Sequence, residues 1–82
     1  MQPAEIERLI EAEFEDATVR VASDDNTHYE ALVVSDEFSG LRALQRHQRV
    51  YRCLGELMGN EIHAMSIRAL TRAEFEEQGG TA

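Results

Sequence analysis

Several residue types are absent from this 82-residue chain or occur only once. Lysine and tryptophan are missing, and there is one cysteine, Cys53, and one proline, Pro3. A single cysteine excludes an internal disulfide framework and favours a reducing compartment. No apolar run approaches the roughly 20 residues of a membrane-spanning helix, and the first residues do not resemble a secretory signal. We therefore expect a cytoplasmic protein without a membrane partner.

Charge of one sign dominates the sequence. Sixteen acidic residues oppose eight arginines, which gives a net charge of −8 at pH 7. This charge repels nucleic-acid phosphates at long range and argues against general nucleic-acid binding, without excluding a local basic patch. The length suits one small domain with a modest core. We expect residues 1–82 to form that single domain and residues 78–82 to fray.

Apolar periodicity and turn residues predict the order of the elements. The expected elements are a helix over 3–15, a strand over 17–23, a turn over 24–27, a strand over 28–35, a long helix over 41–58 and a strand over 62–69. Thr71 and Glu74 form a capping-box pattern that opens a short last helix. This order predicts an α+β fold with a three-stranded sheet and helices on one face.

Two details of this fold follow from the connections. The first two strands form an antiparallel hairpin, whereas the helical crossover lets the second and third strands run parallel. Gly55 marks a bend in the long helix. The core-facing stripe of that helix is expected to consist of residues at spacings of three and four: Leu44, His47, Tyr51, Leu54 and Met58.

One histidine lies in an apolar row. Alternation over residues 62–69 puts His63 on the side of Met65, Ile67 and Ala69, which is the more apolar side and hence the expected core face. A polar ring there needs a hydrogen-bond partner or a ligand to offset its desolvation. A neutral imidazole can also bind a metal. Two interpretations stay open: a structural histidine at the mouth of the strand, and a metal ligand.

The other two histidines differ in position. His28 opens the second strand beside the hairpin tip, so it can approach His63 at one edge of the sheet and form half of an iron, copper or zinc site. Two histidines are too few for a closed zinc site, so a partner would supply further ligands. His47 lies on or beside the core stripe, where we expect a structural ring that donates to a carbonyl.

The remaining reactive groups do not form a catalytic constellation. The chain has no phosphate loop, zinc motif or paired nucleophile and base, so we expect no enzyme and assign no catalytic residue. Cys53 is expected to be a buried, inert thiol unless exposure lets neighbouring arginines lower its pKa. Four arginines recur on one face of the long helix, which is either solvated or docks an acidic partner or phosphates. They are Arg42, Arg46, Arg49 and Arg52.

Taken together, several sequence motifs resemble those of the BolA family, and they span nearly the whole chain. They are Thr27-His28-Tyr29-Glu30, Phe38-Ser39-Gly40-Leu41, Gln45-Arg46-His47-Gln48-Arg49-Val50-Tyr51, Ile62-His63-Ala64-Met65-Ser66-Ile67 and Leu70-Thr71-Arg72-Ala73-Glu74-Phe75. The combination is more specific than any one motif. The short hairpin tip, residues 24–27, is similar to that of the IbaG-like bacterial subgroup.

The resemblance implies a class II KH-like fold with the order α-β-β-α-α-β-α. It also implies a non-enzymatic adaptor that pairs with a monothiol glutaredoxin and shares a two-iron two-sulfur (2Fe-2S) cluster with it and with glutathione. In this picture His63 supplies an iron ligand. The family's second ligand comes from the hairpin loop, which holds neither histidine nor cysteine here, so His28 takes that role. Gly40, Arg42, Arg46 and Arg49 then belong to the docking surface.

Two alternatives from other classes stay open. The chain could be a DNA- or RNA-binding regulator that uses the helix beginning near Leu41, although it lacks the Gly-x-x-Gly loop of true KH modules. It could also be an interaction module whose histidines only satisfy the sheet edge. We expect the isolated chain to be a monomer or a weak homodimer.

Overall fold

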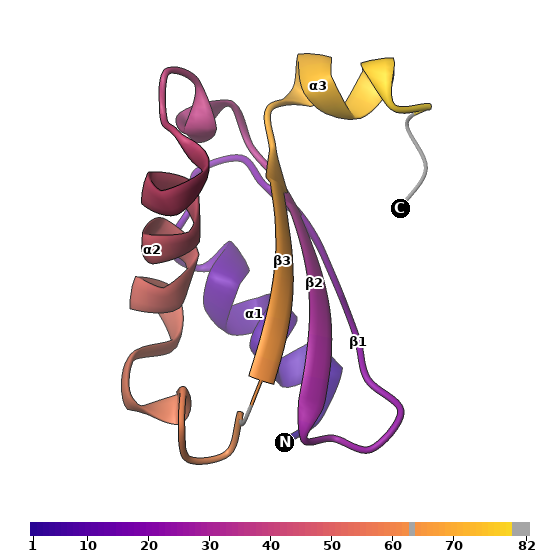
Figure 1. The fold of residues 1–82 in the computed structure, drawn as a ribbon, viewed down its shortest axis with the longest axis vertical. Coiled ribbons are helices and arrows are strands. Elements are labelled where there is room, and N and C mark those ends of the chain that lie inside the picture. Colours follow the sequence, from indigo (N-terminus) through magenta and orange to yellow (C-terminus); the bar gives the residue numbers. More distant parts are fainter. Residues whose placement is uncertain (63, 80–82) are drawn as a thin grey trace.

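The computed structural model describes residues 1–62 and 64–79, and it has the predicted order of elements (Figure 1). The elements are α1 (Pro3–Glu11), β1 (Thr18–Ala22), β2 (His28–Val34), the 3-10 helix η1 (Asp36–Phe38), α2 (Ala43–Leu54), the 3-10 helix η2 (Gly55–Leu57), β3 (Ala64–Leu70) and α3 (Arg72–Glu77). None of the helices among these residues is long and apolar enough to cross a membrane. Of the segment 78–82 that was expected to fray, residues 80–82 lie outside this description, whereas the N–H groups of Gln78 and Gly79 bond to the carbonyls of Glu74 and Glu76 in α3.

The three strands form one sheet in the order β1-β2-β3. β1 and β2 are antiparallel, with Ala22 opposite Glu30 at the hairpin end. β2 and β3 are parallel, from His28 opposite Ala64 to Val34 opposite Leu70. The expected hairpin and parallel crossover are therefore both confirmed, because the segment that contains α2 is long enough to return the chain to the start of a parallel strand.

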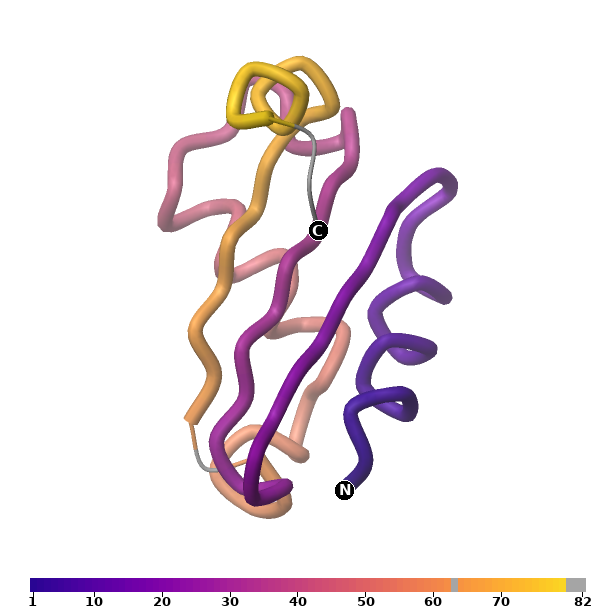
Figure 2. Tube along the Cα trace, turned by 90° about the vertical axis from the view of Figure 1, so that its right-hand side faces the viewer, coloured from indigo at the N-terminus to yellow at the C-terminus, as the bar shows by residue number. Residues whose placement is uncertain are grey.

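Helices α1 and α2 cover one face of the sheet, and the core lies between these layers (Figure 1). α3 starts at the end of β3 and lies on the side of the sheet opposite α2 (Figure 2). The α+β architecture with a three-stranded sheet is thus confirmed, but the prediction that the helices lie on one face holds for α1 and α2 and is wrong for α3. The largest fully buried side chains are Phe38, Ile6, Ile10, Ile62, Val19, Val33, Val34 and Val50.

An aromatic pair anchors the chain at the start of the crossover. Phe38 is fully buried, and its ring meets that of Phe14 edge-on at a centroid distance of 5.4 Å. Just before it, the Ser35 hydroxyl accepts a hydrogen bond from the Glu37 N–H and caps η1. This capped turn directs the chain from the end of β2 into the helical layer.

The predicted core stripe of the long helix is right only in part. Leu54 is buried and Met58 packs against the core, but Leu44 is 69% exposed and Tyr51 is 38% exposed, whereas Val50, outside the predicted stripe, is buried. The side of α2 that faces the core also carries Arg46, whose side chain is only 14% exposed. Its aliphatic stem takes up space that the predicted stripe assigned to apolar side chains. The bend at Gly55 is confirmed: this residue has φ of +52°, and α2 gives way there to η2.

The predicted alternation of the last strand is confirmed over β3 but is wrong at Ile62, which it places on the more polar face and which is fully buried just before the strand. Met65 and Ala69 are buried and Ile67 is partly buried on one face, whereas Ser66 and Arg68 are exposed on the other. His63 lies outside the described residues, so its predicted place on the core face stays a prediction. At the far end of the strand, Thr71 and Glu74 form the expected capping box of α3.

Candidate functional site

A hollow of about 480 Å³ lies where the hairpin loop meets the first residues of β2 and β3. It opens on the face of the sheet that α1 and α2 leave uncovered, and small side chains form much of its floor. Its lining includes Ala22, Ser23, Asp25, His28, Ala64 and Ser66. Polar side chains, among them Asp25 and His28, line the hollow beside these small ones.

The hairpin loop is organised around two side chains. The Ser23 hydroxyl accepts a hydrogen bond from the Asn26 N–H at 2.9 Å and donates to the His28 carbonyl at 2.6 Å. Asp25 Oδ1 accepts from the Thr27 N–H and the His28 N–H, both at 2.9 Å. Asn26 adopts the left-handed conformation with φ of +55°, which asparagine tolerates. Bonds of this kind, from a serine or aspartate side chain to a nearby main-chain group, are typical of turns. The segment here is Ser23-Asp24-Asp25-Asn26.

His28 stands at the rim of this hollow with most of its side chain in solvent. The side chain is 66% exposed, and Nδ1 lies 2.9 Å from Asp25 Oδ2. The His28 N–H bond to the carboxylate, followed by the His28 ring, holds the pKa of Asp25 well below its ordinary value. The Asp25 carboxylate thus faces Nδ1 of the ring, and Nε2 is the other ring nitrogen of this mostly exposed side chain.

The described residues bring His28 close to the start of β3. His28 pairs with Ala64, the residue that follows His63 in the sequence. His63 itself lies outside the described residues, so the expected approach of the two imidazoles stays a prediction. Residues 1–62 and 64–79 contain no group of three or more histidine, cysteine, aspartate or glutamate side chains that could hold a metal.

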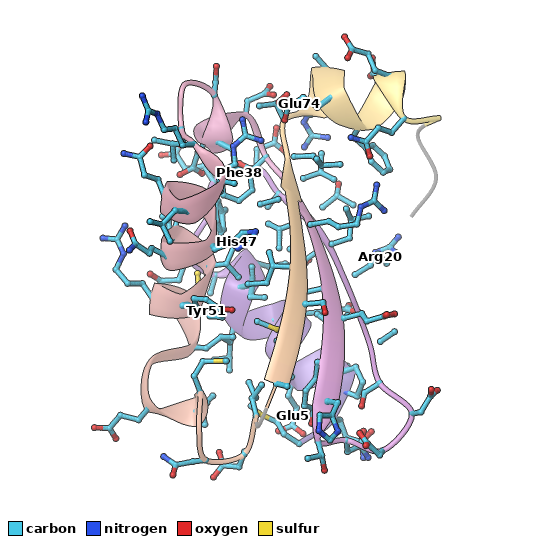
Figure 3. All side chains as sticks on the ribbon, viewed as in Figure 1. Glu5, Arg20, Phe38, His47, Tyr51 and Glu74 are labelled. Atoms are coloured by element: carbon cyan, nitrogen blue, oxygen red, sulfur yellow. The ribbon has the colours of Figure 1, made fainter. Side chains whose placement is uncertain are left out.

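His47 and Cys53 lie on α2, away from the hollow. Cys53 is partly buried, its thiol donates to the Arg49 carbonyl at 3.4 Å, and burial raises the pKa of the thiol. The partial burial agrees with the predicted buried thiol, and the inertness of this thiol stays a prediction. His47 projects from α2 in Figure 3, and no hydrogen bond joins its ring to a carbonyl of residues 1–62 or 64–79.

The expected arginine stripe does not form one solvent-facing surface. Arg42 and Arg52 are exposed, but the side chains of Arg46 and Arg49 are only 14% and 22% exposed. The Arg49 guanidinium lies 4.2 Å from the centre of the Phe14 ring and donates to the Glu13 carbonyl. The docking role assigned to Gly40, Arg42, Arg46 and Arg49 stays a prediction, and the inner two arginines also serve the fold.

Arg46 links three parts of the chain. Its Nε donates to the Leu41 carbonyl and its Nη1 to the Ala69 carbonyl, both at 2.9 Å. The guanidinium also meets the Glu74 carboxylate and lies 5.9 Å from the centre of the Phe38 ring. Sequence periodicity gave no sign of this, because it classes arginine as a surface residue. The Asp25–His28 contact was also missed, although an aspartate three residues before a strand-opening histidine is a turn signal.

Comparisons with known proteins give one family. The family described as BolA-like protein matches residues 4–74. The DNA-binding transcriptional regulator BolA of Haemophilus influenzae is 29% identical over 93% of this chain and 82% of its own length. Human BolA-like protein 1 is 45% identical over 62% of this chain, which there corresponds to 37% of the relative.

Solved structures agree with the sequence relatives. A BolA homologue from Coxiella burnetii superposes with a TM-score of 0.77 at 37% identity, covering 93% of this chain and 97% of that one. The BolA domain of SufE1 from Arabidopsis thaliana also gives 0.77, at 32% identity, over 88% and 93% of the two chains. By fold and by sequence, the chain belongs to the BolA-like family.

Proposed function

We propose that this protein is a non-enzymatic adaptor that pairs with a monothiol glutaredoxin and shares a 2Fe-2S cluster with it, as cargo to be held or passed on. His63 and His28 are the iron ligands on this side of the complex. The observation that carries the proposal is the placement of the His28 ring: Nδ1 lies 2.9 Å from the Asp25 carboxylate, and the side chain is 66% exposed, so a second molecule can reach the ring.

The donor set fits a shared cluster better than a cluster held by this chain alone. A 2Fe-2S cluster needs four protein or thiol ligands, and the described residues offer one exposed imidazole at the hollow and no cluster of three donors. As the family resemblance implies, we propose that the other ligands are glutaredoxin and glutathione thiolates, with His63 added from this chain. Replacing thiolates by neutral imidazoles reduces the negative charge of the cluster and raises its potential.

The shape of the hollow suits such a partner. Ala22 and Ala64 lie beside His28 with short side chains, so a neighbouring molecule can approach the ring without displacing the core. The hairpin loop is held by hydrogen bonds between its own residues. A preformed rim of this kind lowers the ordering cost of binding.

Anaerobic reconstitution with a monothiol glutaredoxin and glutathione, followed by visible circular dichroism, tests the proposal. A spectrum distinct from that of the glutaredoxin homodimer is expected. His63→Ala should abolish this spectrum and His28→Ala should alter it. His47→Gln is the matched control, because it removes the remaining histidine from a helix away from the hollow. An unchanged homodimer spectrum with the native protein overturns the proposal.

A second candidate function rests on the name of one relative, the DNA-binding transcriptional regulator BolA of Haemophilus influenzae. In this chain the exposed arginines at α2 are Arg42, which is the N-cap of the helix, and Arg52, and they would meet phosphates against a net charge of −8. If DNA is bound, its electrophoretic retardation at physiological salt should be weakened by Arg42→Gln with Arg52→Gln. It should persist in Arg8→Gln, which removes an exposed arginine from α1. Arg46 and Arg49 are unsuitable for this test because both hold the fold together.

A further inference from the structure

Asp25 directs both oxygens of its carboxylate into the hairpin loop. Oδ1 accepts from the main-chain N–H groups of Thr27 and His28, and Oδ2 lies 2.9 Å from His28 Nδ1. The two oxygens therefore act on the same residue, one on its backbone and one on its ring. This double contact restrains the His28 side chain relative to the start of β2.

The loop that carries Asp25 is itself anchored on both sides. The Ser23 hydroxyl closes it by donating to the His28 carbonyl and accepting from the Asn26 N–H. On the core side, the Tyr29 hydroxyl lies 2.6 Å from the Asn26 carbonyl and 2.5 Å from the Met1 carbonyl. The His28 ring thus stands on a fixed base, although its own surface is in solvent.

A carboxylate only accepts hydrogen bonds, so the nitrogen that faces it must carry hydrogen. In a neutral ring, hydrogen on Nδ1 leaves the lone pair on Nε2, and a metal binds through the lone pair. Histidine ligands commonly donate their second ring nitrogen to a carboxylate in this way, which fixes the tautomer and the ring orientation.

We infer that Asp25 is a positioning residue: it holds the His28 imidazole with hydrogen on Nδ1 and so presents Nε2 to iron at the rim of the hollow. The inference rests on the proposed function. It adds which ring nitrogen of His28 binds iron and that Asp25 fixes this choice. The contact that selects it lies within the hairpin loop, so the selection is made before any partner arrives.

The tautomer can be measured without cluster or partner. Long-range proton–nitrogen NMR of the 15N-labelled protein, at a pH where the ring is neutral, distinguishes the two nitrogens of each histidine, and loss of a signal in His28→Ala assigns His28. Hydrogen on Nδ1 is expected. Asp25→Asn keeps an oxygen for the two backbone N–H groups but can donate to Nδ1 from its amide, so hydrogen should move to Nε2. Hydrogen on Nε2 in the native protein overturns the inference.

Asp24→Asn is the matched control, because it removes the same charge from the neighbouring exposed position of the loop. It should leave the His28 tautomer as it is in the native protein. If Asp24→Asn and Asp25→Asn change the tautomer equally, charge rather than contact selects it, and the inference fails.

The heterocomplex with glutaredoxin separates this inference from the proposed function. Asp25→Asn should shorten the lifetime of the shared cluster by about tenfold, in line with the lower end of the loss of metal affinity that follows removal of such outer partners. Asp24→Asn should leave it unchanged. If Asp25→Asn moves the hydrogen and the cluster is unaffected while His63→Ala still removes it, Asp25 does not position a ligand and the proposed function stands. If no shared cluster forms with the native protein, the proposed function itself fails.

Discussion

Arg46 on α2 and Glu74 on α3 meet in a two-pronged ion pair, with Nη1 2.7 Å from Oε1 and Nη2 3.3 Å from Oε2. Figure 3 shows Glu74 where β3 passes into α3. The same guanidinium donates to the carbonyl of Ala69 near the end of β3. One side chain of the helical layer therefore joins the crossover helix to the last strand and to the helix that follows it.

Replacing Arg46 should destabilise the fold. Glu74 is 41% exposed, so the ion pair contributes little. The larger effect is that the Leu41 and Ala69 carbonyls lose their charged donor, which predicts a loss of about 2 kcal/mol for Arg46→Ala in urea unfolding. Arg52→Ala removes an exposed arginine from the same helix and should change stability by less than about 0.5 kcal/mol. Equal effects of the two substitutions would show that the Arg46 contacts do not stabilise the fold.

Acid should weaken the contact between α2 and α3. The Arg46 guanidinium, followed by the Thr71 N–H, lowers the pKa of Glu74 from 4.5 to about 2. A depressed folded-state pKa means that the stabilisation is fully present above pH 4.5 and is lost as the pH falls towards 2. Glu74→Gln should therefore lower the urea midpoint at pH 7 and reduce its fall between pH 4.5 and 2. Glu76→Gln, on the exposed side of the same helix, is the control. A fall as steep in Glu74→Gln as in the native protein would contradict this assignment.

The burial pattern of α2 gives a test of the corrected core stripe. Val50 is fully buried, whereas Leu44 is 69% exposed. Val50→Ala should cost about 2 kcal/mol through lost burial and the cavity left behind. Leu44→Ala should change the free energy of unfolding by less than about 0.5 kcal/mol. Urea unfolding of the two variants side by side decides between the two faces, and a larger loss for Leu44→Ala would restore the face predicted from the sequence.

The sequence predicted the strands better than the helix faces for a physical reason. Alternation over β3 depends on side chains that point strictly to one side or the other, so Met65 and Ser66 could be assigned to opposite faces. On α2 the inward positions include Arg46 and Arg49, whose stems are apolar and whose charged ends find partners within the fold. A count of apolar residues cannot register such positions.

At the candidate site, the sequence indicated which residue types lie there but not which side chains contact one another. His28 could be placed beside the hairpin tip because turn residues precede it directly. Its contact with Asp25 depends on the left-handed conformation at Asn26, which turns the chain so that the carboxylate and the ring meet. Of several residues compatible with such a turn, the sequence does not say which adopts the conformation.

Cys53 offers a last prediction, in which two opposing effects act on one thiol. Arg49 Nη1 lies 3.6 Å from Sγ and favours the thiolate, but burial outweighs it and raises the pKa of Cys53. Because the thiolate is the reactive form, iodoacetamide should modify Cys53 more slowly in the folded protein at pH 8 than in protein unfolded by urea. Cys53→Ser gives the background rate. A folded rate equal to or above the unfolded rate would mean that Arg49 dominates, and Cys53 would then be a reactive thiol rather than part of the half-buried packing between α2 and the core.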